Sequence, residues 1–91
     1  MSNNQEGHSL EKHRSIIDEI DSELLKLLNE RAKCVIKIGK IKIKEKKGVL
    51  DPLREKELLD RLRSVNKGPM TDAMVMHIFQ QIIDTLKDLQ K

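Results

Sequence analysis

The sequence has little of what β-rich, disulfide-bonded and membrane-spanning proteins depend on. Its 91 residues include one Phe, no Trp and no Tyr, while apolar residues make up 37% and charged residues 36%. This composition suits long amphipathic helices better than sandwiches or barrels. No stretch approaches the ~18 apolar residues of a membrane span. We therefore predict an all-α protein that does not enter a membrane.

Cysteine and charge exclude further classes. The single cysteine, Cys34, cannot form an internal disulfide, and no Cys or His pair has the spacing of metal ligands, so we expect no metal site. The chain carries 18 basic and 15 acidic residues, a net charge of +3. Such a mixed surface is not typical of a nucleic-acid partner. We expect a cytoplasmic protein that binds no nucleic acid.

The length fits one domain with a thin core. A domain of this size buries only roughly 60 to 65% of its unfolded surface. The first residues are polar and lack an apolar segment, so we divide the chain into a flexible tail, residues 1–8, and a folded domain, residues 9–91.

A long first helix is predicted from Ser9 to about Lys47, because no Pro interrupts it and apolar residues recur at 3-4 spacing. Ser9 is the expected N-cap, and Lys46-Lys47-Gly48 is the expected end. The apolar stripe consists of Ile17, Ile20, Leu24, Leu27, Leu28, Val35 and Ile38.

Two features inside this segment leave choices open. The alternation from Ile41 to Lys44 could form a short strand, but no second strand-like run exists to pair with it, so we keep the helix. Gly39 costs about 1 kcal/mol relative to Ala in a helix. It indicates either a close approach of another backbone or a weak point.

Two shorter helices follow. Asp51 as N-cap and Pro52 as first residue open the second, whose apolar face is Leu58, Leu59, Leu62 and Val65. A break at 66–69 precedes a third helix, which Thr71 caps and which runs to the chain end. Its inner face consists of Val75, Ile78, Phe79, Ile82, Ile83, Leu86 and Leu89.

The first helix is too long for a monomer of this size. About 38 residues span about 57 Å, whereas a compact domain of this length is about 25 Å wide. Two short helices cannot cover the stripe along its whole length, so a second copy of the chain is the expected partner. We predict an intertwined homodimer.

Two cations fall within the apolar stripe, Arg31 and Lys42, and Arg14 lies close to it. A charge in an apolar layer is costly unless it is paired. The cations could reach the edge or pair with carboxylates of a neighbouring helix. Alternatively, they surround a pocket for an anionic ligand, since Arg suits carboxylates and Lys can face an ether or hydroxyl oxygen.

The shorter helices show the same character more weakly. Glu55 falls within the apolar arc of the second helix, and Arg54 lies just beyond it. Gln90 lies near the edge of the third helix's arc, beside the end of the chain. A solvated face remains an alternative for Glu55 and Arg54.

Taken in order, the motifs resemble the AroQ-type chorismate mutases, over about residues 9 to 90. They are most similar to the short modules that precede other shikimate-pathway enzymes in bifunctional proteins. The matching pieces are Arg14-x3-Asp18-x2-Asp21, Leu27-Leu28-Asn29-Glu30-Arg31, Ile38-Gly39-Lys40-Ile41-Lys42 and Asp51-Pro52-x-Arg54-Glu55.

The resemblance implies a domain-swapped dimer that rearranges chorismate to prephenate without cofactor or metal, in two sites lined by both chains. Arg14 of one chain would reach the partner's site and, with Arg31, hold the substrate carboxylates. Lys42 and Gln90 would face the ether oxygen of the breaking bond. We therefore expect Lys42, Gln90 and Arg31 to be catalytic.

The resemblance also assigns the second helix to substrate binding. Glu55 and the Asp51 backbone would engage the ring hydroxyl, and Arg54 would support the carboxylate end. One departure is Leu86, where relatives often have Ser, so one carboxylate contact is missing or rebuilt. Another shikimate-pathway enzyme is a candidate partner.

Two alternatives stay open. An isochorismate-pyruvate lyase shares the fold and the cationic pocket, although Asp51-Pro52-x-Arg54-Glu55 favours the mutase. A basic helical binding module would instead use the run from Lys37 to Lys47, and would bind DNA in a strongly salt-dependent way.

Overall fold

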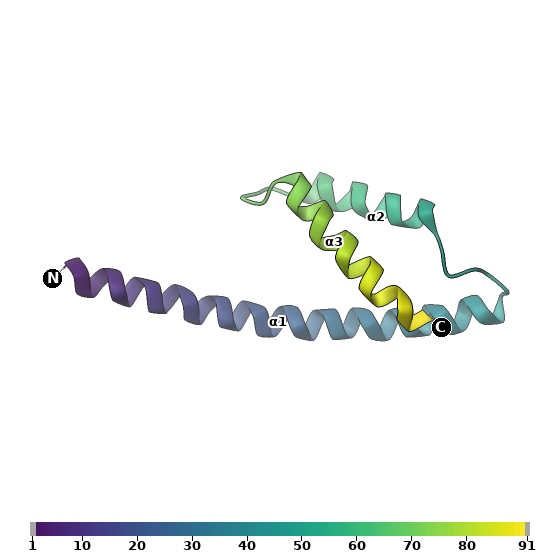
Figure 1. Ribbon diagram of the computed structural model, residues 1–91, viewed down its shortest axis with the longest axis horizontal. Helices are drawn as coiled ribbons and strands as arrows, with labels where there is room; N and C mark the ends of the chain where they lie inside the picture. Colours follow the sequence, from purple (N-terminus) through teal and green to yellow (C-terminus); the bar gives the residue numbers. More distant parts are fainter. Residues whose placement is uncertain (1, 91) are drawn as a thin grey trace. The chain divides into compact units, whose positions relative to one another are not determined.

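A computed structural model describes the backbone of residues 2–90 and the side chains of residues 9–90. The elements are α1 (Ser2–Lys44), α2 (Pro52–Val65), α3 (Asp72–Lys87) and a short 3-10 helix, η1 (Asp88–Gln90) (Figure 1). The described residues contain no strand. The predicted all-α class with one long and two shorter helices is confirmed, and the alternative of a strand at 41–44 is wrong.

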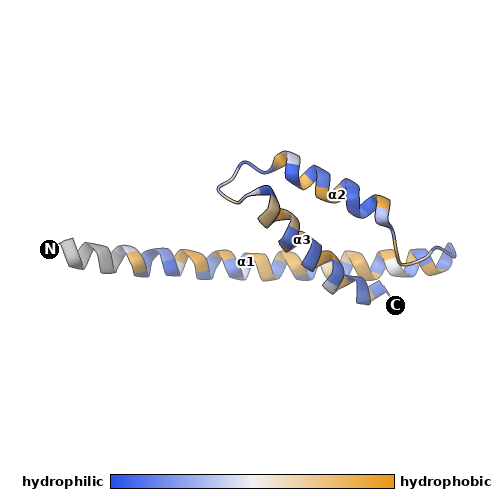
Figure 2. Cartoon of the chain, turned by 45° about the horizontal axis from the view of Figure 1, so that its top comes forward, coloured by the Kyte–Doolittle hydropathy of each residue, from blue (hydrophilic) through white to orange (hydrophobic). Residues whose placement is uncertain are grey.

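The chain divides into two units, Met1–Arg31 and Ala32–Lys91. The first consists of the N-terminal part of α1, along which apolar residues recur between polar ones, as Figure 2 shows in orange and blue. A single helix cannot bury its own apolar side chains. Accordingly, seven large apolar residues of this unit are at least 42% exposed: Leu10, Ile16, Ile17, Ile20, Leu24, Leu25 and Leu27.

The second unit contains the core. Val35 on α1 and Val75 and Ile83 on α3 are less than 10% exposed. The predicted inner faces are partly confirmed, because Leu58, Leu59 and Leu62 of α2 and Phe79, Ile82 and Leu86 of α3 are half-buried. Four predicted positions, by contrast, are exposed in the single chain: Ile38, Val65, Ile78 and Leu89.

Both boundaries predicted for the long helix need correction. Helix α1 begins at Ser2, so Ser9 is not its N-cap. The Ser9 carbonyl instead accepts a bond from Nδ1 of His13 at 2.6 Å, one turn along the helix. Polar residues and the lack of an apolar pattern do not prevent helix formation. The mobility expected of residues 1–8 stays a prediction.

Helix α1 ends at Lys44 rather than at about Lys47. Lys46 has φ 60, the left-handed conformation that ends many helices. The amides of Lys46 and Lys47 donate to the carbonyls of Ile43 and Lys42, at 3.1 and 2.7 Å. This is the Schellman pattern of bonds, with a lysine where glycine is usual.

The caps of the other helices are as predicted. Asp51 accepts a bond from the Arg54 amide at 3.1 Å, with Pro52 in the first turn of α2. Thr71 accepts one from the Met74 amide at 3.1 Å. These side chains satisfy amides that lack a partner within the helix.

The break between α2 and α3 is also as predicted, and Asn66 organises it. The Asn66 side chain donates to the Met70 carbonyl at 2.9 Å and to Asp72 at 3.2 Å, and accepts from the Gly68 amide at 3.1 Å. The Gly68–Pro69 peptide bond is cis. One side chain thus holds the turn that folds α3 back along α2.

Candidate active site

Lys42 lies at the centre of a polar cluster in the second unit. Its half-buried side chain donates from Nζ to the Val49 carbonyl at 3.1 Å and to Oε1 of Gln90 at 3.2 Å. An ammonium group has three N–H donors. Two acceptors therefore hold Lys42 in place and leave one donor without an acceptor among the described residues.

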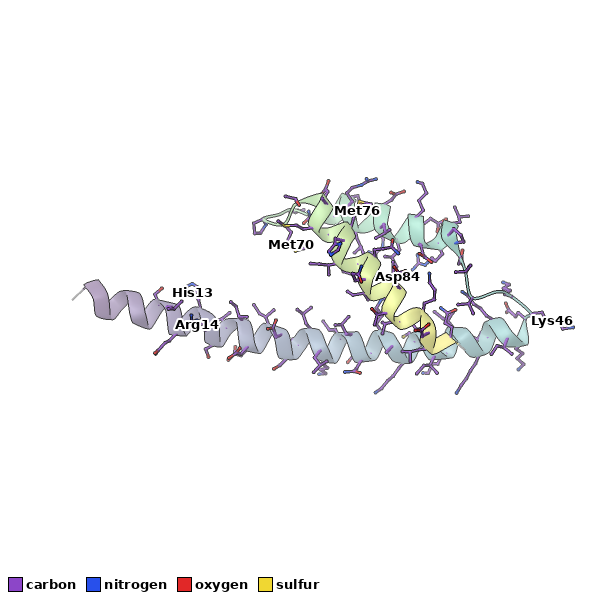
Figure 3. All side chains as sticks on the ribbon, viewed as in Figure 1. His13, Arg14, Lys46, Met70, Met76 and Asp84 are labelled. Atoms are coloured by element: carbon purple, nitrogen blue, oxygen red, sulfur yellow. The ribbon has the colours of Figure 1, made fainter. Side chains whose placement is uncertain are left out.

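The turn after α1 brings Val49 to this position. Because the Lys46 and Lys47 amides bond back to the last turn of α1, the chain reverses direction there. Val49 follows three residues after Lys46, which Figure 3 labels at this turn (Figure 3). The turn after α1 thus supplies the Val49 carbonyl, the backbone acceptor that orients the Lys42 side chain of α1.

Gln90 reaches Lys42 because the residue of α1 that lies against the Gln90 backbone is a glycine, Gly39. A Cβ atom built on Gly39 would lie 2.7 Å from Cα and 2.8 Å from the carbonyl oxygen of Gln90. Real Cβ atoms do not approach backbone atoms this closely. Of the two interpretations of Gly39, the close backbone approach is confirmed. It allows η1 to lie directly on α1.

Gln90 was also predicted to continue the third helix. Helix α3 instead ends at Lys87, and Gln90 is the last residue of η1. The tighter 3-10 turn has fewer residues per turn than an α-helix, so it changes the direction in which the following side chains point. The resemblance placed Lys42 and Gln90 at the same substrate oxygen, and in the structure the two side chains are hydrogen-bonded to each other.

A second cluster surrounds Glu55 in the first turn of α2. One carboxylate oxygen lies 3.0 Å from Nζ of Lys87, and the other accepts from Nε2 of Gln80 at 3.5 Å. Asp84, labelled on α3 in Figure 3, lies 3.6 Å from the Lys87 ammonium. The hydrogen bond to Glu55 is the main reason that the pKa of Lys87 is raised. Lys87 is therefore protonated at neutral pH.

The remaining predicted groups of α2 are exposed. Asp51 uses a side-chain oxygen to cap the helix, and its carbonyl accepts from the Glu55 amide at 3.1 Å. The Arg54 guanidinium has no hydrogen-bond or ion-pair partner among the side chains that the structure describes. It is free to meet an anionic group.

Arg14 and Arg31 belong to the first unit. Arg14 is exposed and Arg31 is half-buried, and neither guanidinium has a hydrogen-bond or ion-pair partner within residues 9–90. The structure therefore assembles Lys42 with Gln90, and Glu55 with Lys87. The two arginines enter the site only as part of the proposal below.

Sequence reasoning missed Val49, Gln80 and Lys87. A backbone acceptor such as the Val49 carbonyl leaves no signal in side-chain patterns. Lys87 did leave a signal in the sequence, because it precedes Gln90 by three residues. This spacing places side chains on one face of a helix. Leu86, the departure from the family pattern, is half-buried and offers no polar atom. Lys87 is thus the cation next to the position where relatives often have Ser.

Other polar groups do not form a further site. Among the residues that the structure describes, no group of three or more His, Cys, Asp or Glu side chains could hold a metal ion. The pKa of Asp60 is lowered, chiefly by its hydrogen bond with Lys56, on the exposed face of α2. None of the helices in the described part of the chain is long and apolar enough to span a membrane.

Comparison with known families matches residues 13–91 to the family described as chorismate mutase type II. The chain belongs to this family. A solved chorismate mutase from Thermus thermophilus, form II, superimposes with a TM-score of 0.88 and 32% identity. The match covers 89% of this chain and 92% of the other. The predicted family is confirmed, and the fold extends over nearly the whole of a chorismate mutase chain.

Two curated relatives show different lengths. The bifunctional chorismate mutase/prephenate dehydratase of Aquifex aeolicus is 38% identical over 90% of this chain, which spans 24% of that protein. The chorismate mutase of Methanocaldococcus jannaschii is 39% identical over 86% of this chain, which spans 80% of that protein. The family segment therefore occurs both as a small part of a longer protein and as most of a shorter one.

Proposed function

We propose that this chain catalyses the intramolecular rearrangement of chorismate to prephenate. The observation that supports this most directly is the Lys42–Gln90 pair, in which the ammonium group of Lys42 donates to the side-chain amide of Gln90 in a chain of the type II chorismate mutase family. The substrate is a small dianion that rearranges alone. Such a reaction needs positioned charges rather than a nucleophile.

The chemistry is a cyclic shift of electron pairs within one molecule. The ether C–O bond breaks while a C–C bond forms, so no atom or proton leaves the substrate. Negative charge grows on the ether oxygen in the transition state. The remaining N–H donor of Lys42 and the amide N–H of Gln90 would meet this charge, and would stabilise the transition state more than the ground state.

Arg31 and Arg54 of one subunit, together with Arg14 of the partner subunit, would bind the two substrate carboxylates. Guanidinium groups match carboxylates through paired donors. Holding both carboxylates would keep the flexible substrate in the compact conformation that reacts, which is an orientation effect. The absence of competing ion pairs at these guanidinium groups among the described residues supports this role.

Glu55 and the Asp51 backbone would bind the ring hydroxyl. The Glu55 carboxylate has about four lone-pair positions, and Lys87 and Gln80 occupy only two of them. It can therefore still accept a bond from a hydroxyl group. This contact would recognise the ring rather than act on the breaking bond.

The active form would be a homodimer with two shared sites. Seven large apolar side chains of α1 in the first unit are at least 42% exposed, and a second copy of the chain can cover such an apolar surface. The arginine at position 14 lies on that same segment. A cytoplasmic location and a further shikimate-pathway enzyme as partner remain predictions from the sequence.

The decisive experiment follows the ultraviolet absorbance of chorismate with purified wild-type protein and with Lys42→Ala, and identifies the product. Prephenate from the wild type alone supports the proposal. Release of pyruvate from isochorismate, with no prephenate from chorismate, would support the lyase instead. Salt-dependent DNA binding without turnover of either compound would support the binding module.

A further inference from the structure

The Lys87–Glu55 pair differs from the other ion pairs of the described side chains. It joins two helices, and its side chains are only 25% and 23% exposed. The pair Lys56–Asp60 lies within α2 and is 74% and 42% exposed. Surface pairs of the latter kind contribute little to stability. The inter-helix pair therefore calls for a separate explanation.

Stability alone is a weak explanation for it. Removing two charges from water costs much of what their attraction returns, and apolar pairs of similar size are often at least as stabilising. A leucine or methionine at position 87 would cover α2 without this cost. What an ion pair provides instead is a defined geometry for each charged group.

The geometry concerns Glu55 in particular. Lys87 holds one carboxylate oxygen at 3.0 Å and Gln80 approaches the other at 3.5 Å, both from α3. The carboxylate is thereby fixed against α3, close to the helix end that continues into η1 and Gln90. A freely rotating glutamate would lose rotamer entropy on binding a hydroxyl group.

We propose that Lys87 is a positioning residue for substrate recognition, which fixes the Glu55 carboxylate so that it accepts the ring hydroxyl of the substrate. This inference rests on the proposed function. Lys87 acts through Glu55 and does not touch the breaking bond. The positively charged side chain beside Leu86 is thus part of the ring-binding side of the site.

The role predicts a particular kinetic pattern. The ring hydroxyl is present in both the ground state and the transition state, so a contact with it contributes to binding of both. Lys87→Met should raise KM for chorismate about tenfold, with little change in kcat. Loosened packing of α3 would instead misplace Gln90 and lower kcat.

The matched control is Lys56→Met, which makes the same substitution and also removes an ion pair with a carboxylate of α2. It should leave both KM and kcat unchanged. Lys87→Arg, which can keep the ion pair, should restore KM to within about threefold of the wild type. Helix content measured by circular dichroism in each variant shows whether the fold is kept.

Two further comparisons test whether Lys87 acts through Glu55. In a Glu55→Gln background, Lys87→Met should cause little additional rise in KM, because its target is already altered. With a chorismate analogue that lacks the ring hydroxyl, the wild type and Lys87→Met should have the same KM.

The outcomes separate the two proposals. A wild type that does not convert chorismate would overturn the proposed function and this inference with it. A wild type that converts chorismate, together with a Lys87→Met variant whose KM equals that of Lys56→Met, would overturn this inference alone. A fall in kcat, or an equal loss with the hydroxyl-free analogue, would assign Lys87 a structural role instead.

Discussion

The two units of the chain treat their cations in opposite ways. In residues 32–90, Lys42 and Lys87 each have partners from elsewhere in the same unit. In residues 9–31, Arg14 and Arg31 have no hydrogen-bond or ion-pair partner within the described residues. In the second unit, Lys42 and Lys87 are therefore oriented before any ligand binds. The first unit depends on what binds to it.

This difference follows from chain topology. Residues 32–90 fold back on themselves through two turns, so side chains distant in sequence can meet. Residues 9–31 form a single helix, on which side chains meet only neighbours three or four positions away. A lone helix can present charges but cannot enclose them. The comparison therefore predicts which substitutions act within one chain and which act across two.

The largest expected effect is the loss of turnover in Lys42→Ala, which removes one of the oriented cations. We expect turnover to fall about a hundredfold to a thousandfold, as for loss of one donor to a developing oxyanion. The fold should be kept, because the side chain is only half-buried. The measurement is kcat for chorismate with circular dichroism beside it. Lys40→Ala, on the exposed face of α1, is the control, and near-native turnover by Lys42→Ala would refute the role of Lys42.

The second largest effect is expected for Arg14 and Arg31, the two arginines of the first unit. Arg14→Ala and Arg31→Ala should each lose most activity, because each leaves a substrate carboxylate without its guanidinium partner. After the two inactive proteins are mixed and exchange subunits, about a quarter of the sites should be intact, since about half of the dimers are mixed and each restores one of two sites. The measurement is turnover as exchange proceeds.

The control for this experiment is a mixture of Arg31→Ala with Lys42→Ala. Both residues would serve the same site from the same chain, so mixed dimers contain no intact site and activity should not recover. Failure of Arg14→Ala and Arg31→Ala to complement each other, despite demonstrated exchange, would argue against a site shared between two chains.

A smaller effect is expected for Gly39→Ala, which sharpens the comparison within the oriented unit. The new Cβ would lie 2.7 Å from the Gln90 Cα, so η1 must shift and the Lys42–Gln90 bond must weaken. We expect kcat to fall about tenfold to a hundredfold, up to the loss of one oxyanion donor.

Gly48→Ala is the matched control for Gly39→Ala, because nothing lies within 4 Å of a Cβ at Gly48. It should leave kcat unchanged. Equal activity of the two variants would mean that the close approach of Gln90 to α1 has no part in catalysis.

The smallest effect concerns the turn that supplies Val49. Lys46 has φ 60, which costs a residue with a Cβ about 1 kcal/mol relative to glycine. Lys46→Gly should therefore raise the free energy of unfolding by up to about 1 kcal/mol, measured by urea denaturation. Lys47→Gly, where φ is not positive, should give no gain. Destabilisation by Lys46→Gly would show that the lysine side chain itself holds the turn.

The helices were predictable because their signals are local. Period-3.6 apolar residues, the caps Asp51 and Thr71 and the break at 66–69 depend only on neighbouring residues, and all are present. The boundaries of α1 were not predictable, because a polar segment can continue a helix and because a lysine can adopt the conformation usual for glycine. Both depend on small energies that composition does not reveal.

The sequence named candidate site residues but not the contacts between them. Apolar periodicity marked Lys42 as a charge in an apolar stripe, and the family resemblance placed Lys42 and Gln90 at the same substrate oxygen. The partner Val49 lies in the turn after α1, and the partners Gln80 and Lys87 lie on α3. Their arrangement depends on where the chain reverses and on which residue of α1 lacks a side chain.

The sequence by itself determined three helices, part of their inner faces and the family, because these depend on spacing and residue type along the chain. Only the tertiary structure decided that Gly39 admits Gln90, that Val49 and Gln90 orient Lys42, and that Lys87 fixes Glu55. The Lys42–Gln90 contact, for example, joins residues 48 positions apart. Distances between such residues are set by turns and packing, which no local pattern specifies.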